Sequence, residues 1–187
     1  LIKEIDKYKG KTSLNFRKYM SSKAFGLTAY YDSMIANWFN KKLKIKFPER
    51  KTIFGKKFKQ LRYGENPHQE SSIYINNYKD EELGLSQLNG KELSFNNYND
   101  TDAAYELVAE FEDIACAIIK HANPCGAAIS DTLADAYRKA LTCDPESAFG
   151  GIVALNKTVD EETAVEISKL FAEVVIAPDI TPEARKI

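Results

Sequence analysis

The chain has 187 residues, of which 44% are hydrophobic and 11% are aromatic, so it has enough apolar material to bury a core. Its 26 Lys and Arg residues are balanced by 27 Asp and Glu residues, which leaves a formal net charge of -1. This balance argues against a general electrostatic attraction to nucleic acid or to an anionic membrane, so any anion site must be local.

The first predicted element is a helix that begins at Ser21 or Ser22, after a highly charged stretch. Its apolar side chains recur at helical spacing, which predicts a face that packs against a core. Residues 40–60 are strongly basic around Pro48 and Gly55, which is typical of an exposed linker between domains. A nucleic-acid patch is the alternative interpretation, but few aromatic residues interleave with the basic ones. The residues on the predicted helix face are Phe25, Leu27, Tyr31, Met34, Ile35 and Trp38.

Beyond residue 60 the pattern changes to alternating short apolar runs and helical segments, which is typical of an α/β domain. One helix is expected to be capped by Asn99 or Asp100 and to place residues 103–111 against the core. Another is expected from 161 to 171, capped by Asp160. A third helix is predicted from about 132 to 141, and strands are predicted at 72–75, 114–119, 151–155 and 174–177.

Lys120 and His121 follow the predicted strand 114–119. In open α/β sheets, side chains at the carboxyl ends of strands line the crevice in which ligands bind. A histidine titrates near neutrality and can move a proton, and an adjacent lysine can stabilise developing negative charge. The two side chains can serve one site if the chain turns there, which Pro124 and Gly126 make possible. From the residues alone, a structural role for the pair stays open.

Two further segments combine glycine with groups that could bind a ligand. In the loop 61–69, Arg62 could hold a phosphate and Gly64 would let the backbone approach a ligand, although an ordinary surface turn has the same composition. In 147–151, the glycines before a strand could leave room for a flat ring, and Phe149 could stack on it. A tight turn is the alternative there.

The residues around His121 argue against a zinc site. The zinc deaminase pattern requires a glutamate two residues after the histidine and a second cysteine three residues after the first, but Asn123 and Ala128 stand at those positions. Cys116 lies within an apolar run and is interpreted as a core residue. The three cysteines are too few, and odd in number, for a secreted disulfide framework, and no run is long enough to span a membrane. We therefore expect a soluble cytoplasmic protein without a metal.

Five blocks of the sequence together resemble the PurH family, the bifunctional enzymes that carry out the last two steps of inosine monophosphate (IMP) synthesis. The order and the spacing of the blocks also match the family. The blocks are Lys23-Ala24-Phe25 with 28–36, LRYGENPHQ at 61–69, LNGKELSFNNYNDTDAA at 88–104, KHANPCGAA at 120–128 and ESAFGGIVALN at 146–156.

The resemblance implies a partial cytidine-deaminase-like α/β domain that has kept the fold without the zinc, preceded by a helical remnant of the cyclohydrolase domain. Residues 1–40 would be that remnant, 41–60 a basic linker, and 61–187 the first part of the formyltransferase domain. Because the chain starts at Leu1 and both ends look cut, we expect a fragment that is inactive alone. The family also implies a homodimer.

By the same resemblance, the reaction transfers a formyl group from 10-formyltetrahydrofolate, a co-substrate, to the amine of AICAR (5-aminoimidazole-4-carboxamide ribonucleotide). Lys120 and His121 match the catalytic pair, with His121 accepting a proton and Lys120 stabilising the oxyanion or protonating the departing nitrogen. A non-catalytic nucleotide-binding or dimer-assembly module is the alternative. The expected substrate-binding residues are Arg62, Tyr63, Asn97, Phe149, Gly150 and Glu173.

Overall fold

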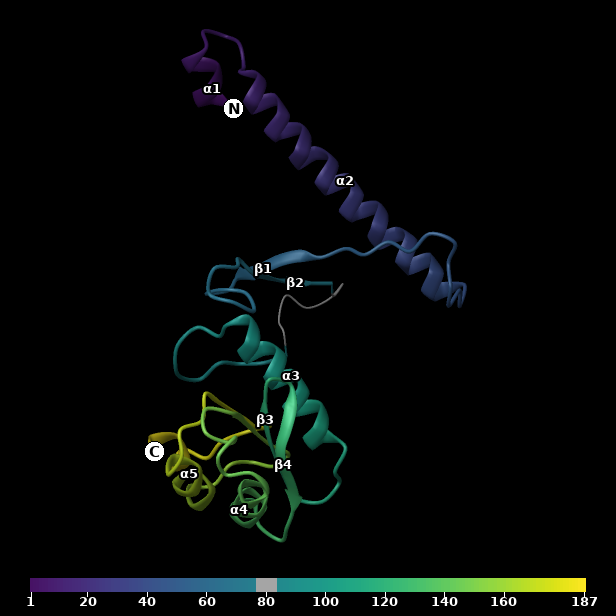
Figure 1. The fold of residues 1–187 in the computed structure, drawn as a ribbon. Coiled ribbons are helices and arrows are strands. Elements are labelled where there is room, and N and C mark those ends of the chain that lie inside the picture. Colours follow the sequence, from purple (N-terminus) through teal and green to yellow (C-terminus); the bar gives the residue numbers. More distant parts are fainter. Residues whose placement is uncertain (77–83) are drawn as a thin grey trace. The chain divides into compact units, whose positions relative to one another are not determined.

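A computed structural model describes residues 1–76 and 84–187 of the chain. It divides into two compact units (Figure 1). The first contains Leu1–Lys59 with Ser72–Ser86, and the second contains Gln60–Ser71 with Gln87–Ile187. No helix in these described ranges is both long and apolar enough to cross a membrane.

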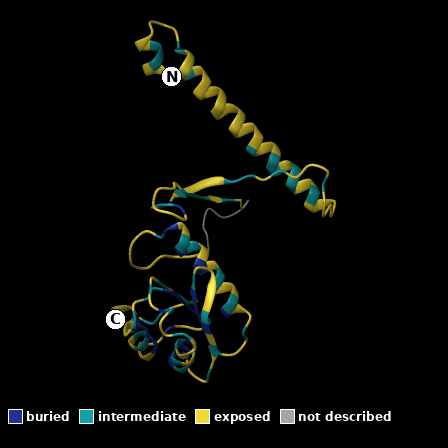
Figure 2. Cartoon of the chain, viewed as in Figure 1, coloured by how far each residue is buried: buried dark blue, intermediate teal, exposed yellow. Residues whose placement is uncertain are grey.

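The first unit is built on the long helix α2 (Leu14–Lys42), which follows the short helix α1 (Ile2–Lys7). The Ser13 side chain caps α2 by accepting a hydrogen bond from the Phe16 amide at 3.2 Å, so the helix starts earlier than the predicted Ser21 or Ser22. The predicted core-facing side is also wrong for the described structure, because α2 buries none of its residues and Phe25 is 75% exposed (Figure 2).

After α2, the chain folds back along the helix and enters a two-stranded sheet. The Asn37 side-chain amide donates to the Thr52 carbonyl at 3.0 Å, and the Tyr30 and Phe54 rings meet edge to face with centroids 5.6 Å apart. Strand β1 (Lys56–Gln60) then pairs with β2 (Ser72–Ile75). The segment 41–60, predicted as a linker, therefore ends in a strand, whereas the strand predicted at 72–75 is found as expected.

The second unit is a mixed four-stranded sheet with helices on both faces. Strand β3 is antiparallel to both β4 and β5, and β5 is parallel to β6, in the order β4-β3-β5-β6. The strands are β3 (Ala115–Lys120), β4 (Asn123–Ile129), β5 (Ile152–Leu155) and β6 (Val174–Ile176). The helices are α3 (Phe95–Ala109), α4 (Leu133–Cys143) and α5 (Glu161–Ser168), followed by the 3-10 turn η1 (Ala184–Lys186).

The buried strands β3 and β5 explain why their sequences are continuous apolar runs. Alternate residues of β3 enter two different cores, since successive side chains of a strand point to opposite faces. Cys116 and Ile118 pack with residues of α4 and α5, whereas Ala117 and Ile119 pack with Ala104 and other residues of α3. The unit is therefore a three-layer α/β structure, and α3 covers one face of the central strands.

Most predicted elements of this unit are found within a few residues of their expected bounds, but two predictions fail. Helix α3 begins at Phe95 and not after Asn99 or Asp100, because Ser94 and Asn97 form a capping box at its start. The third helical residue of this capping box is Asn instead of the usual Glu or Gln. Strand β4 was not predicted, since Pro124 and Gly126 suggested a turn. Asp160 caps α5 as predicted, accepting from the Thr163 amide at 2.8 Å.

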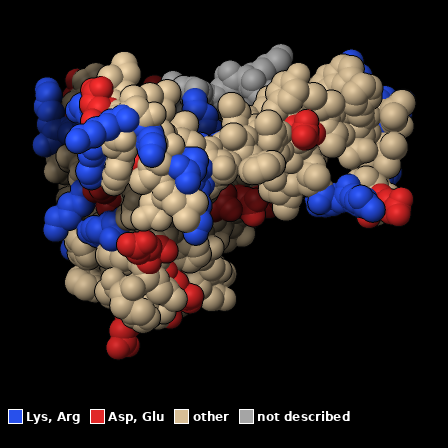
Figure 3. Space-filling view, turned by 90° about the horizontal axis from the view of Figure 1, so that it is seen from above, with Lys and Arg blue, Asp and Glu red and all other residues tan. Residues whose placement is uncertain are grey.

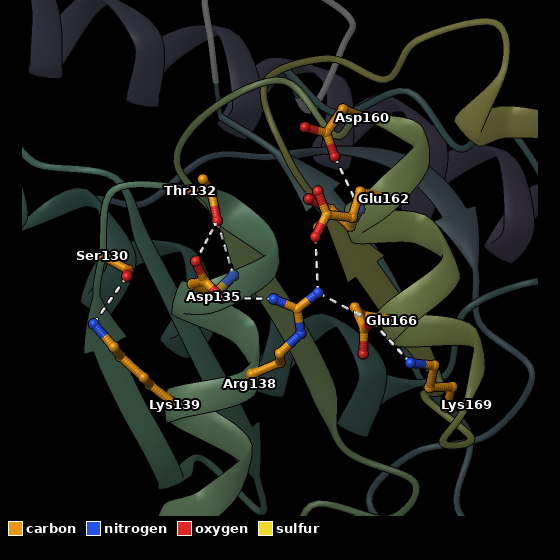
Figure 4. Close-up of polar contacts among 10 residues, drawn as sticks. Ser130, Thr132, Asp135, Arg138, Lys139, Asp160, Glu162, Glu166 and Lys169 are labelled. Atoms are coloured by element: carbon orange, nitrogen blue, oxygen red, sulfur yellow. Dashed lines mark hydrogen bonds and ion pairs between the residues drawn. The ribbon is translucent and has the colours of Figure 1, made fainter.

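A surface ion-pair network joins α4 to α5 (Figure 4). The Arg138 guanidinium binds Glu162 at 2.8 Å and Glu166 at 3.1 Å on α5, as well as Asp135 on its own helix. Its hydrogen bond, together with that of Lys169 at 2.7 Å, lowers the pKa of the Glu166 carboxyl. Because most of these side chains keep substantial contact with solvent, and only that of Glu166 is as little as 17% exposed, the network orients the two helices more than it stabilises the fold.

Candidate functional site

Lys120 and His121 lie where β3 turns back into β4. Lys120 pairs with Asn123 across the hairpin, so His121 and Ala122 are the two central residues of the turn. Their φ angles are +52° and +55°, as in a type I′ turn, whose central positions favour Asn and Gly. For residues with a side chain, this left-handed conformation costs about 1–2 kcal/mol each, so something else must hold the turn in place.

Asp100, on α3, holds this turn. Its carboxylate accepts the His121 amide at 3.0 Å through Oδ2 and the Ala122 amide at 2.8 Å through Oδ1. The Asn123 side chain adds a hydrogen bond to the His121 carbonyl at 2.7 Å. Asp100 is only 9% exposed, and charge-assisted bonds of this kind are among the stronger ones. His121 itself is exposed, so its imidazole is available to a ligand.

The half-buried Lys120 side chain reaches the loop that precedes β5. Its ammonium donates to the Phe149 carbonyl at 2.9 Å. The Phe149 ring is exposed, with its centroid 5.7 Å from that of Phe171, and the Gly150 amide donates to the Phe171 carbonyl at 2.8 Å. Gly150 has a φ of +72°, which explains the need for glycine there. The contact is possible because antiparallel pairing brings the end of β3 to the start of β5.

Glu173 enters the same region from the residue before β6. Its amide donates to the Gly151 carbonyl at 3.0 Å, and its carboxylate accepts a short hydrogen bond from the Asn97 side-chain amide. The Asn97 carbonyl oxygen accepts from the amide and from the hydroxyl of Ser94, each at 3.0 Å. Asn97 is buried and occupied by these contacts, so its clearest role in the structure is to orient Glu173.

Arg62 and Tyr63 lie on a loop attached to the first turn of α3. The Tyr63 carbonyl accepts the Phe95 amide at 3.4 Å. The Arg62 guanidinium is exposed, lies 4.9 Å from the centre of the Tyr63 ring and donates to its hydroxyl at 3.2 Å. A Cβ at Gly64 would lie 2.8 Å from Cβ of Gln69, so the tight loop requires glycine. The guanidinium is thus held by stacking while its charge faces solvent.

Helix α3 therefore connects the predicted site residues. Its residues contact the Tyr63 loop, Glu173 and the His121 turn, while Lys120 connects this turn to Phe149. The expectation of a crevice at the carboxyl ends of strands is only partly correct. The end of the sheet that carries the carboxyl end of β3 also carries the amino ends of β5 and β6, because β3 is antiparallel to β5.

Sequence reasoning missed the roles of Asp100 and Ser94. Asp100 was considered only as a possible helix cap, and the true cap is Ser94. Ser94 could have been found from the Ser-x-x-Asn spacing before an apolar helical face. The partners of Asp100 stand 21 and 22 residues further along the chain, so local sequence carries no signal for them.

Cys116 and Cys125 do not resemble catalytic thiols. Burial raises the pKa of the Cys116 thiol to about 12, and burial and the nearby Asp144 carboxylate raise that of Cys125. Within residues 1–76 and 84–187 there is no group of three or more His, Cys, Asp and Glu side chains that could hold a metal ion. Both basic and acidic side chains appear on the face seen in Figure 3.

The second unit is an α/β structure in which helix α3 contacts the segments that carry Tyr63, Glu173 and His121, while the Lys120 ammonium donates to the Phe149 carbonyl. The family described as AICARFT/IMPCHase bienzyme matches residues 1–187, and the chain belongs to this family.

Relatives from several bacteria agree with this assignment, and each is named bifunctional purine biosynthesis protein PurH. The Rhizobium johnstonii protein is 54% identical over 191 residues, which cover 100% of this chain and 36% of the relative. The Rhizobium leguminosarum bv. trifolii protein is 56% identical over 182 residues, which cover 95% of this chain and 34% of the relative. The Brucella anthropi protein is 53% identical over 191 residues, which cover 100% of this chain and 36% of the relative. The chain thus spans about a third of the length of these relatives.

Proposed function

We propose that this chain is part of an enzyme of purine biosynthesis that transfers a formyl group from 10-formyltetrahydrofolate to AICAR and cyclises the product to IMP. The observation that carries the proposal is the family match over all of residues 1–187. The contacts of α3 with Glu173 and with the His121 turn, together with the adjacent Lys120 ammonium, support formyl transfer as the step to which this chain contributes.

In this proposal, residues 61–187 are the first part of a formyltransferase domain with a cytidine-deaminase-like fold, and residues 1–40 belong to the cyclohydrolase domain, with 41–60 between them. The exposed apolar residues of α2 support an assignment to a larger domain, since such a helix is normally covered. The enzyme would act as a cytoplasmic homodimer without a metal, and the chain alone would be inactive because it spans only about a third of its relatives.

His121 would accept a proton from the 5-amino group of AICAR as the amine nitrogen attacks the formyl carbon. The lone pair of this amine is delocalised into the imidazole and carboxamide, so attack requires removal of the proton. Lys120 would stabilise the tetrahedral oxyanion and protonate the folate nitrogen as its bond to the formyl carbon breaks, which gives formyl-AICAR and tetrahydrofolate. The Lys120 ammonium has three donors and uses one on the Phe149 carbonyl, so two remain for the reaction.

The substrate contacts would come from the segments attached to α3 and β5. The exposed Arg62 guanidinium supplies the positive charge for the 5′-phosphate, and Tyr63 limits its movement by stacking. Phe149 and Gly150 would accommodate the planar imidazole. The Glu173 carboxylate, oriented by Asn97, would accept a hydrogen bond from the nucleotide.

The test is His121→Ala in the full-length enzyme that contains this chain. The turnover number of formyl transfer should fall roughly 10²- to 10⁴-fold, with AICAR affinity little changed, because a general base is lost. Cyclohydrolase activity, assayed separately on formyl-AICAR, should persist.

Arg62→Ala is the contrasting variant, and it should weaken AICAR binding as well. If His121→Ala kept more than about a tenth of the wild-type turnover, His121 would have to be reassigned to binding or packing. A wild-type protein that binds AICAR without turnover would favour the non-catalytic module instead.

A further inference from the structure

The β3–β4 turn has an unusual support for a turn of this kind. Neither of its central residues is Asn or Gly, although both have positive φ angles. Both of their amides donate to a single carboxylate, that of Asp100, which lies on another element and is almost fully buried. The conformation of the turn is thus determined by a side chain of α3 more than by the turn residues themselves.

The turn conformation sets the direction in which the His121 side chain leaves the backbone. A residue in the left-handed region projects its Cβ differently from one in an extended strand, so relaxation of the turn would move the imidazole. Lys120 is the last residue of β3 and is held separately, by the Phe149 carbonyl. Relaxation would therefore change the placement of His121 relative to Lys120 and to a bound nucleotide.

We propose that Asp100 is a positioning residue for formyl transfer, which acts by clamping the backbone amides of His121 and Ala122 so that the His121 imidazole is held ready to accept a proton. The proposal rests on the function proposed above for His121. Both of its carboxylate oxygens bind the turn, so in this proposal Asp100 acts through His121 and not through contact with the substrate. The geometry predicts that its loss changes the turnover number and leaves nucleotide binding in place.

The first variant is Asp100→Asn in the full-length enzyme. The side-chain NH₂ group of the new Asn cannot accept a hydrogen bond from the backbone amide that it faces. One of the two hydrogen bonds to the turn is therefore lost, and two N–H donors face each other. The turnover number should fall by up to about 10²-fold, the scale expected for a misplaced catalytic group, while the AICAR dissociation constant from equilibrium binding stays nearly unchanged. The matched control is Asp102→Asn, an exposed acidic residue of the same helix, which should leave both quantities unchanged.

A rescue experiment separates positioning from a general effect of charge or stability. Adding Ala122→Gly to Asp100→Asn places a residue that tolerates positive φ in the turn, so the turn needs less support from the carboxylate. The turnover number of the double variant should be roughly five- to tenfold higher than that of Asp100→Asn alone. A role of Asp100 through its charge would not respond to this glycine, so failure of the rescue would overturn the proposal.

The outcomes also distinguish this proposal from the proposed function. If His121→Ala abolishes turnover but Asp100→Asn keeps most of it, the clamp is wrong and the function stands. If His121→Ala itself keeps turnover, the function proposed for His121 fails and the clamp fails with it. If circular dichroism shows that Asp100→Asn does not fold, Ala122→Val strains the same turn with Asp100 in place. That variant should lower the turnover number at unchanged AICAR affinity, and unaltered turnover would overturn the proposal.

Discussion

Gly126 provides the sharpest test of how the hairpin that carries His121 is packed. It is buried on β4, where a Cβ would lie 2.0 Å from the Ala140 carbonyl oxygen and 2.9 Å from the Ala140 carbonyl carbon, both in the backbone of α4. Real Cβ atoms essentially never approach other heavy atoms within 3.0 Å. Gly126→Ala must therefore push α4 away from β4, because a helix backbone cannot rotate aside as a side chain can.

The cost follows from the size of this clash. Overpacking of a core typically costs about 1–3 kcal/mol, and an obstacle made of backbone places Gly126→Ala at about 3 kcal/mol. For a unit of about 110 residues, that loss corresponds to a fall in Tm of about 13 °C. Urea denaturation followed by circular dichroism, together with hydrogen exchange of the β3 and β4 amides, would measure the free energy of unfolding of this unit.

Gly26→Ala is the matched control, since it adds the same methyl group on α2 with no heavy atom within 4 Å. It should stabilise the helix by about 0.5–1 kcal/mol, because alanine loses less conformational entropy than glycine in a helix. The packing argument would be refuted if Gly126→Ala were as stable as the wild type.

Two further predictions concern pH and the cap of α3. Burial raises the pKa of Cys116 in the folded state to about 12, from the usual 9.0 of an exposed thiol. Above about pH 9 the thiol therefore ionises in the unfolded state but not in the folded state. The free energy of unfolding should then fall by about 1.4 kcal/mol per pH unit because of Cys116. Urea titrations at pH 8, 9 and 10 should show that Cys116→Ala reduces this slope and the exposed Cys143→Ala does not; equal slopes would contradict the assignment. Ser94→Ala should cost about 1–2 kcal/mol by removing the cap and should also weaken AICAR binding, because Asn97 then loses the hydrogen bond from the Ser94 hydroxyl that helps to orient it toward Glu173. Urea denaturation and AICAR titration should separate it from Ser168→Ala on the exposed end of α5, and equal stability of the two variants would contradict the capping argument.

The predictable parts of the fold are those determined by local sequence. The apolar run of β3 and the Asp160 cap of α5 show their structure within a few neighbouring residues, and both are found close to the predicted positions. Strand β4 could not be found in this way, because Pro124 and Gly126 are turn-forming residues. Pro124 is accommodated where the register shifts between Ile118 and Ile119, and Gly126 is required by the close approach of α4. Both reasons depend on partners distant in sequence.

In the candidate site, the residue types could be predicted from the sequence, but their arrangement could not. Lys120 and His121 attract notice because their chemistry suits acyl transfer, whatever the conformation of the chain. The direction of the His121 side chain depends on a turn that its own residues disfavour, and on a carboxylate 21 residues earlier in the chain. Strain of this kind persists only where the surrounding structure supports it. A helix whose buried face supplies Asn97 to Glu173 and Asp100 to His121 can hold separate parts of a site in one geometry, so substitutions of these two buried residues should affect catalysis without touching the substrate.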